Sequence, residues 1–279
     1  MKIQLVRGAT VRMEYAQRRF LMDPFLAARH SVRSFAGKSP NPLVDLPCPP
    51  RDVVANIDLA LISHLHPDHF DRTAQELLPK DTPILCQVAD EARIAAKGFY
   101  RVTPVAESLV WQGVTITRTP CQHGSGDVLA QMGEASGFVF QAAHEPTVYW
   151  AGDTVWNDAV AGIIDRFQPK VIITHSCGAV WGEQVLIVMD AAQTVAVCQA
   201  APGSIVVATH MDALDHATVS RAALRQYASA HGIRSEQLLI PADGETLVFW
   251  GEQTGSAAAQ HRLATDGAVL PRDPFDFAT

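Results

Sequence analysis

The sequence is poor in cysteine and has no long apolar run, and each deficit excludes a class of protein. Its five cysteines are scattered and odd in number, and no two of them form a CxxC pair. A disulfide framework and a cysteine zinc cluster are therefore excluded as organising features. No stretch of roughly eighteen apolar residues occurs, which excludes a membrane-spanning helix.

Positive charge is also scarce, because 22 Lys and Arg face 29 Asp and Glu, for a formal net charge of −7. Proteins that bind nucleic acid without sequence preference depend on basic surface, so this balance favours a small-molecule substrate over nucleic acid. The segment Met1–Arg7 becomes polar too early for a signal peptide. We therefore expect a cytoplasmic protein.

No linker rich in Pro, Gly or Ser divides the 279 residues, which predicts a single domain over residues 1–279. Residues 25–51 read as an irregular insertion with five prolines. A loop of this length is typical of a lid over a site, and a surface excursion without a role is the alternative. The C-terminal tail, residues 251–279, carries Phe275 and Phe277. Docking on the body, docking on a second subunit of a homo-oligomer, and disorder are its three interpretations.

Strand and helix patterns alternate along the first half of the chain. Short β segments are predicted first, and an apolar run of strand length follows the insertion. Helices near Thr73–Leu78 and Ala89–Lys97 then separate further strands. The predicted strands are Lys2–Arg7, Thr10–Tyr15, Arg18–Met22, Ile57–Ser63, Ile84–Val88, Ser108–Trp111 and Thr115–Pro120. This alternation predicts a layered α/β fold.

The second half repeats the plan of the first. A predicted hairpin, Gly137–Gln141 with Thr147–Ala151, ends at Asp153, as the earlier hairpin ends at Asp23. Strand Val171–Thr174 leads to His175 as strand Leu59–Ser63 leads to His64, and Ile205–Thr209 leads to His210 as Thr115–Pro120 leads to His123. The order strand–Asp, strand–His, strand–His thus occurs twice, which predicts an internal duplication with two similar halves facing each other.

The segment Ser63–His69 concentrates metal-ligating residue types directly after a predicted buried strand. His64 and His66 alternate by two and so point to one side, and Pro67 then turns the chain toward Asp68 and His69. Imidazole nitrogens and a carboxylate suit zinc or a similar divalent ion. These four residues can begin two metal sites, and the remaining ligands must come from later in the chain.

The HxHxDH pattern of His64–His69 resembles the signature of the metallo-β-lactamase fold superfamily. Asp23-Pro24, His123, Asp153 and His210 follow in the order of that superfamily's other motifs. The ending His210–His216, together with Asp23-Pro24, looks most like the ascorbate-6-phosphate lactonase-like branch. The resemblance implies an α/β fold, a four-layer αβ/βα sandwich built from two pseudo-symmetric halves.

The resemblance also implies a metal centre with two ions, for which zinc is the expected element and manganese the alternative. His64, His66 and His123 would hold the first ion, whereas Asp68, His69 and His210 would hold the second. Asp153 would bridge the two ions. Asp23 would support the ligand-bearing loop without touching a metal, with a turn-forming Asp-Pro as the alternative.

Such a centre predicts a metal-dependent hydrolase that uses a metal-activated hydroxide on a small ester, lactone or phosphate ester. Asp68 is the candidate general base if one ion is bound. His175 is a candidate for substrate contact or proton donation, and His216 for substrate contact; structural roles are the alternatives for both. The competing hypotheses are a phosphodiesterase or nuclease of the same superfamily, a di-iron redox relative, and a non-catalytic binding protein.

Overall fold

The computed structural model describes residues 1–249, so the predicted C-terminal tail lies outside the described residues. Within this range the chain forms two seven-stranded sheets. The first sheet has the order β16 (Thr246–Val248), β1 (Lys2–Arg7), β2 (Thr10–Tyr15), β3 (Arg18–Met22), β4 (Leu59–Ile62), β5 (Ile84–Cys86) and β6 (Val102–Pro104). The second has the order β15 (Leu238–Leu239), β14 (Ile205–Thr209), β11 (Val171–His175), β10 (Val148–Trp150), β9 (Ser136–Gln141), β8 (Val114–Pro120) and β7 (Ser108–Trp111).

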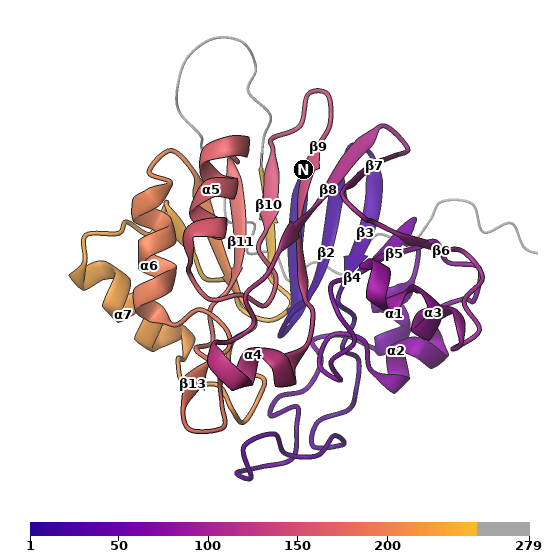
Figure 1. Ribbon diagram of the computed structural model, residues 1–279, viewed down its shortest axis with the longest axis horizontal. Helices are drawn as coiled ribbons and strands as arrows, with labels where there is room; N and C mark the ends of the chain where they lie inside the picture. The colour runs from indigo at the N-terminus through magenta and orange to yellow at the C-terminus, as the bar shows by residue number, and fades with distance from the viewer. Residues whose placement is uncertain (250–279) are drawn as a thin grey trace, which may run out of the picture.

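Helices cover the outer face of each sheet and make a four-layer sandwich, as predicted (Figure 1). The first sheet carries α1 (Pro50–Val54), α2 (Arg72–Leu77) and α3 (Glu91–Ala95), and the second carries α5 (Asp158–Phe167), α6 (Ala191–Ala200) and α7 (Arg221–Ala230). Helix α4 (Gly126–Met132) and a small hairpin of β12 (Val180–Trp181) and β13 (Val185–Leu186) lie below the sheets in Figure 1.

Period-two alternation of apolar side chains explains why the sheets stack. On β9 and β10, Phe138 and Trp150 pack against the first sheet, whereas Val139 and Tyr149 pack against the helices of the second. Successive side chains on a strand point to opposite faces, so strands that are apolar at every position become buried on both sides. The core between the two sheets therefore fixes their strand ends relative to each other.

The predicted duplication holds in part. In each sheet an antiparallel pair is followed by two parallel pairs, β2–β3–β4–β5 in the first and β9–β10–β11–β14 in the second. Asp23 and Asp153 therefore follow corresponding strands, β3 and β10. His64 and His175 likewise come from corresponding strands, β4 and β11.

The predicted equivalence of His123 and His210 is wrong. Strand β8, which leads to His123, pairs antiparallel with β9 and so corresponds to β1, the antiparallel neighbour of β2. Strand β14, which leads to His210, corresponds to β5. The order of strands along the chain does not reveal which neighbour each strand pairs with, and this ambiguity produced the error.

Residues 25–49 are largely irregular and lie below the strand ends as the dark purple segment of Figure 1. The buried Arg7 holds both ends of this insertion. Its guanidinium donates to the carbonyls of Phe25 at 2.9 Å, Ala27 at 2.9 Å and Val44 at 3.2 Å. It also lies over the Phe25 ring, 4.9 Å from the centroid. A single cation thereby satisfies three backbone carbonyls that no strand pairs.

The carboxylate of Asp71 joins the insertion to α2. It caps the helix by accepting from the backbone N–H groups of Thr73 and Ala74, and it also accepts from Leu26 N–H at 2.9 Å. Among residues 1–249, no helix is long and apolar enough to cross a membrane.

We predict that Asp71→Ala destabilises the protein by about 1–2 kcal/mol, because it removes a helix cap and leaves Leu26 N–H buried without an acceptor. Asp71→Asn keeps an acceptor oxygen and serves as the matched control. In a thermal melt we expect the Ala variant to unfold roughly 2–4 °C below the wild type for each kcal/mol lost. Equal melting temperatures for the Ala and Asn variants would contradict the capping role.

Candidate metal centre

The predicted site residues meet at the strand ends between the two sheets, although they come from distant parts of the chain. His64, His66, Asp68 and His69 lie in the turn after β4, His123 follows β8, Asp153 follows β10, His175 ends β11, and His210 follows β14. The carboxyl ends of parallel strands share one edge of a sheet, which is where such folds build their sites. Stacking of the two sheets then brings both edges together.

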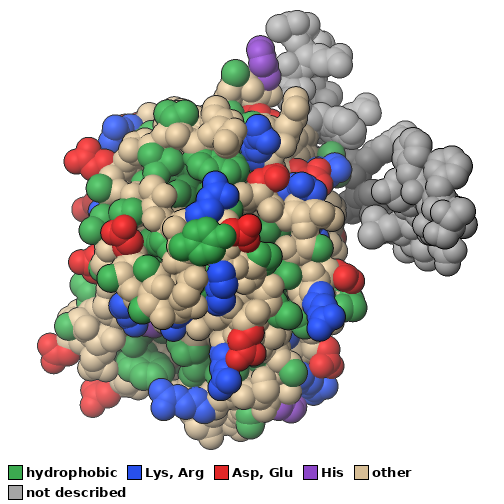
Figure 2. Space-filling view, turned by 90° about the vertical axis from the view of Figure 1, so that its right-hand side faces the viewer, with side chains coloured by type: hydrophobic (Ala, Val, Ile, Leu, Met, Phe, Trp, Pro, Cys, Tyr) green, Lys and Arg blue, Asp and Glu red, His purple; other side chains and the backbone are tan. Residues whose placement is uncertain are grey.

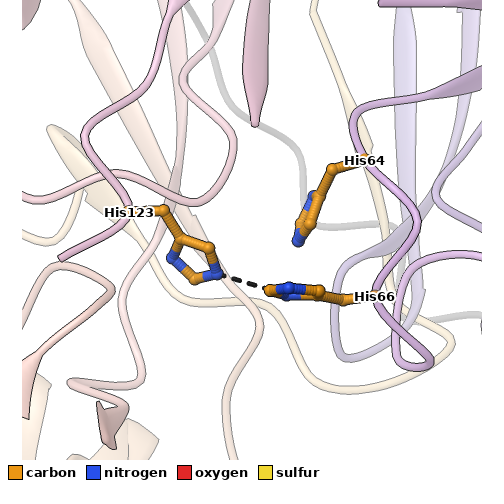
Figure 3. A group of neighbouring side chains, drawn as sticks. All are labelled: His64, His66 and His123. Atoms are coloured by element: carbon orange, nitrogen blue, oxygen red, sulfur yellow. Dashed lines mark hydrogen bonds between the residues drawn. The ribbon is translucent and has the colours of Figure 1, made fainter. Parts of the chain in front are cut away.

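Four overlapping groups of potential ligands form, each with its ligand atoms within 4.8 Å of one another. Two of them contain Asp153, with His64 and His69 or with His175 and His210, and two do not. One group is His64, His66 and His123, and Figure 3 shows the three rings converging from opposite sides of the site. The other group is Asp68, His69 and His210. The structure therefore brings together the residues of each set that the resemblance implied.

Asp153 lies between the two groups. Its Oδ2 is 3.1 Å from His69 Nε2, 3.5 Å from His123 Nε2 and 3.9 Å from His64 Nε2, and its Oδ1 is 3.9 Å from His210 Nε2. Only 3% of the residue is exposed. One carboxylate thus faces imidazoles from both groups, as a bridging ligand requires.

Hydrogen bonds to Nδ1 aim the opposite ring nitrogen of several histidines into the site. His123 Nδ1 lies 2.7 Å from the Ile187 carbonyl, and His69 Nδ1 lies 2.7 Å from Asp23 Oδ2. Because both partners are acceptors, Nδ1 of each ring donates a hydrogen bond, and Nε2 is the nitrogen that faces the site. Both histidines are thereby prepared to bind a metal through Nε2.

A chain of hydrogen bonds fixes His64 in the same way. Ser63 Oγ donates its proton to Asp23 Oδ2 at 2.6 Å and therefore accepts from His64 Nδ1 at 2.8 Å. His64 Nε2 is then a buried atom without a protein hydrogen-bond partner. A buried polar atom left in this state needs a partner, and a divalent cation at this position supplies one. The residues present therefore fit a metal ion.

The charges of the cluster also suit a cation. Burial lowers the pKa of His64 far below its ordinary value and lowers the pKa of His123 to about 4, so both rings are neutral. Burial opposes ionisation of Asp153, but His69 and His210 outweigh it and hold the Asp153 pKa well below its usual value. Burial likewise lowers the pKa of His69, yet Asp153 foremost raises it to about 10. A metal ion replaces such protons when it binds.

Asp23 lies behind the ligand loop, as expected, and is fully buried. Its carboxylate accepts from Ser63 N–H at 2.8 Å, from Ser63 Oγ and from His69 Nδ1. Its backbone has a φ of 44°, a left-handed conformation that aspartate adopts more readily than most residues. The carboxylate of the Asp-Pro turn is therefore directed into the loop that carries the histidines.

His175 and His216 occupy different environments. His175 is fully buried, and both ring nitrogens contact protein groups: Nδ1 lies 2.5 Å from Asp153 Oδ1, and Nε2 accepts from Trp150 Nε1 at 3.2 Å. His216 is 6% exposed, and its buried Nδ1 has no hydrogen-bond partner. Asp68, also 6% exposed, has its Oδ2 3.4 Å from His210 Nε2.

Sequence reasoning missed several residues that hold the cluster in place. The sequence did not predict a role for the Ser63 hydroxyl, which donates to Asp23, or for the Trp150 indole, which donates to His175. It also did not predict a role for the Cys177 thiol, which lies 3.9 Å from His210 Nδ1. Ser63 directly precedes the HxHxDH pattern, so its position was a usable signal. Trp150 and Cys177 gave none, because each also reads as an ordinary core residue.

A four-layer sandwich with a buried histidine and aspartate cluster at its strand ends indicates an enzyme that depends on bound metal ions. Comparison with known proteins agrees. The family model for the beta-lactamase superfamily domain matches residues 18–211. The UPF0173 protein YddR of Bacillus subtilis (strain 168) is 34% identical over 255 residues, covering 89% of this chain and all of that protein.

Two solved structures are similar over nearly their whole length. An isothiocyanate hydrolase from Delia radicum gut bacteria is 36% identical, with a TM-score of 0.85, covering 89% of this chain and 99% of that one. A possible metal-dependent hydrolase from Veillonella parvula is 35% identical, with a TM-score of 0.85, covering 88% and 98%. The chain belongs to the metallo-β-lactamase superfamily.

We predict that Asp23→Asn weakens metal binding about 10–100-fold, because His69 loses the charged acceptor that orients its ring. Asp58→Asn, which disturbs a carboxylate paired with Arg19 at the surface, is the matched control. Competition with a chromophoric chelator measures the affinity. Wild-type affinity in Asp23→Asn would show that the carboxylate only shapes the turn.

Proposed function

We propose that the chain binds two divalent ions, zinc or alternatively manganese, and hydrolyses a small organic molecule at an electrophilic carbon. The observation that carries this proposal is the arrangement of two ligand groups around one shared carboxylate, Asp153. A single structural ion is usually closed by four ligands, whereas paired catalytic ions need more ligands and an open position for water. The seven residues supply enough ligands for a pair of ions.

Bound divalent ions lower the pKa of water and polarise the atom under attack. The residues of the chain then have separate tasks. The imidazoles of both groups would hold the ions, and Asp153 would be shared between the two sites. Asp68, whose Oδ2 lies 3.7 Å from His69 Nε2 and 3.4 Å from His210 Nε2, would accept the proton of the attacking water if only one ion were bound.

Similarity to an isothiocyanate hydrolase supports a carbon electrophile as the reacting centre. In the hydrolysis of an isothiocyanate, the water oxygen bonds to the central carbon and the carbon–nitrogen bond breaks. The nitrogen takes both protons of water, so the products are an amine and carbonyl sulfide. Esters and lactones react by the same first step, addition of water oxygen to carbon. The motifs that resemble the lactonase-like branch support esters and lactones as further candidate substrates.

A nucleic-acid substrate is disfavoured by charge. The net charge is −7, and on the face drawn in Figure 2 Lys and Arg side chains are scattered among Asp and Glu. Nucleic-acid binding requires basic side chains gathered along a groove. We therefore rank phosphodiesters behind carbon electrophiles.

For His175 we propose a positioning role in place of proton donation. The Trp150 indole can only donate, so His175 Nε2 must be the acceptor and Nδ1–H must donate to Asp153 Oδ1. This arrangement fixes the tautomer of the ring and the orientation of the carboxylate. With both nitrogens engaged, the ring has no free atom for a substrate.

We predict that His66→Ala lowers kcat/KM at least roughly 100-fold and reduces the bound zinc from about two to about one ion per chain. Elemental analysis and a hydrolysis screen of isothiocyanates, lactones, thioesters and phosphodiesters provide the measurements. His231→Ala, which removes an exposed histidine stacked on Tyr227, is the matched control. Full activity after loss of metal would refute the proposed mechanism.

We predict that Trp150→Phe weakens metal binding about 10-fold, because His175 loses the donor that fixes its tautomer and hence the orientation of Asp153. Trp181→Phe removes an indole that donates to Gln131 at the surface and is the control. Chelator competition gives the affinity, and thermal melting of the metal-free proteins separates it from loss of packing. Unchanged affinity in Trp150→Phe would remove His175 from the positioning role.

A further inference from the structure

Asp215, in the loop that follows β14, is another buried carboxylate and directly precedes His216. It accepts from five groups on a single short segment, residues 34–39: the Ser34 hydroxyl and the backbone N–H groups of Phe35 at 2.9 Å, Ala36 at 3.1 Å, Lys38 at 3.2 Å and Ser39 at 3.3 Å. Asn41 Nδ2 also donates to it at 2.9 Å.

These donors keep the carboxylate ionised and the segment folded. Burial would raise the pKa of Asp215, but the bonds from Ser34 and Asn41 foremost hold it well below the usual value. Asn41 Oδ1 in turn accepts from the backbone N–H of Asp215 at 2.9 Å, and the backbone of Asn41 pairs with that of Val32. Backbone N–H groups that converge on one anion cannot move independently, so the segment has a fixed shape.

The fixed segment sets Phe35 against His216. The two rings meet edge to face, with centroids 5.2 Å apart and an interplanar angle of 88°. Phe35 is half-buried and packs on an apolar cluster of Phe25, Ala213 and Leu214. One part of its ring therefore rests on the body of the protein, and the rest is available to another apolar group.

His216 connects this segment to the metal centre. It lies six residues after His210, in the loop that follows β14, and this loop packs against the insertion through Ala213 and Leu214. Its Nδ1 is buried without a hydrogen-bond partner, and the residue is 6% exposed. A buried imidazole nitrogen with no protein partner beside a metal centre is placed to bond a polar atom of a ligand.

We propose that residues 34–41 form a preformed recognition wall beside the metal centre, in which Phe35 contacts an apolar substituent of the substrate and the free Nδ1 of His216 bonds a polar atom of the same molecule. The class of ligand is a small molecule with an apolar, preferably aromatic, group next to its reacting carbon. The proposal rests on the proposed function for the reaction, but its recognition step can be measured by binding alone.

Hydroxamates test the wall because they attach to zinc whether or not the protein cleaves any substrate. We expect the zinc-loaded wild type to bind benzohydroxamate about 10-fold more tightly than acetohydroxamate, and Phe35→Ala to lose most of this preference. Tyr100→Ala, which removes an aromatic side chain that is 72% exposed, is the control and should keep it. Calorimetry gives the dissociation constants. Equal affinities in the wild type, or an unchanged preference in Phe35→Ala, would overturn the proposal.

Limited trypsin digestion tests the role of Asp215 without metal or substrate. Arg33 and Lys38 are exposed cleavage sites on the segment. We expect Asp215→Ala to be cut there at least roughly 10-fold faster than the wild type, because local opening exposes the backbone to protease. Asp58→Ala is the control. Equal cleavage rates would show that Asp215 does not fix the segment.

The two proposals fail in different ways. A wild type that cleaves none of the isothiocyanates, lactones, thioesters or phosphodiesters but keeps the benzohydroxamate preference overturns the proposed function and supports the wall. A wild type that cleaves methyl and benzyl isothiocyanate with equal kcat/KM, and binds both hydroxamates equally, supports the function and overturns the wall.

Discussion

Asp153 is ionised although only 3% of it is exposed, and most of the site follows from the need to stabilise that buried charge. A carboxylate removed from water is costly unless cations and donors surround it. Here the surrounding groups are imidazoles from both sheets, with His175 donating to Oδ1 and the ring of His69 facing Oδ2. Because His64 Nε2 in the same cluster is buried without a hydrogen-bond partner, the arrangement that stabilises the carboxylate also favours a divalent ion.

This constraint explains why the fold needs two halves. One sheet supplies the HxHxDH turn after β4, and the other supplies Asp153, His175 and His210 at the ends of β10, β11 and β14. The apolar layer between the sheets, rich in side chains such as Phe20, Phe138 and Trp150, holds the two sets of strand ends in register. Packing thus determines distances that no local sequence signal specifies.

Local sequence patterns predicted the secondary structure better than they predicted the contacts between distant residues. Strands Lys2–Arg7, Arg18–Met22 and Ile205–Thr209 were predicted with the boundaries they have, because alternation and flanking turns define them. The predicted helix Ala89–Lys97 is instead a 3₁₀ turn, Val88–Asp90, followed by the short α3, and helix ends are set by capping contacts that periodicity does not reveal. The assignment of histidines to two metal sites was predicted from the order of the superfamily's motifs along the chain. The partners of His175 and Asp215 could not be predicted, because they depend on which strands and loops meet in space.

Asp153 and Asp215 show two ways of burying a negative charge in one protein. Around Asp153 the partners are mainly side chains, whose protons a metal ion can replace, so that carboxylate can take part in ligand exchange. Around Asp215 the partners are mainly backbone N–H groups of residues 35–39. A metal ion cannot replace the protons of these groups, and their hydrogen bonds fix the path of the chain. The first arrangement suits a reacting centre and the second suits a rigid wall. His216 follows Asp215 directly, so a rigid backbone at the wall also fixes the position of this histidine.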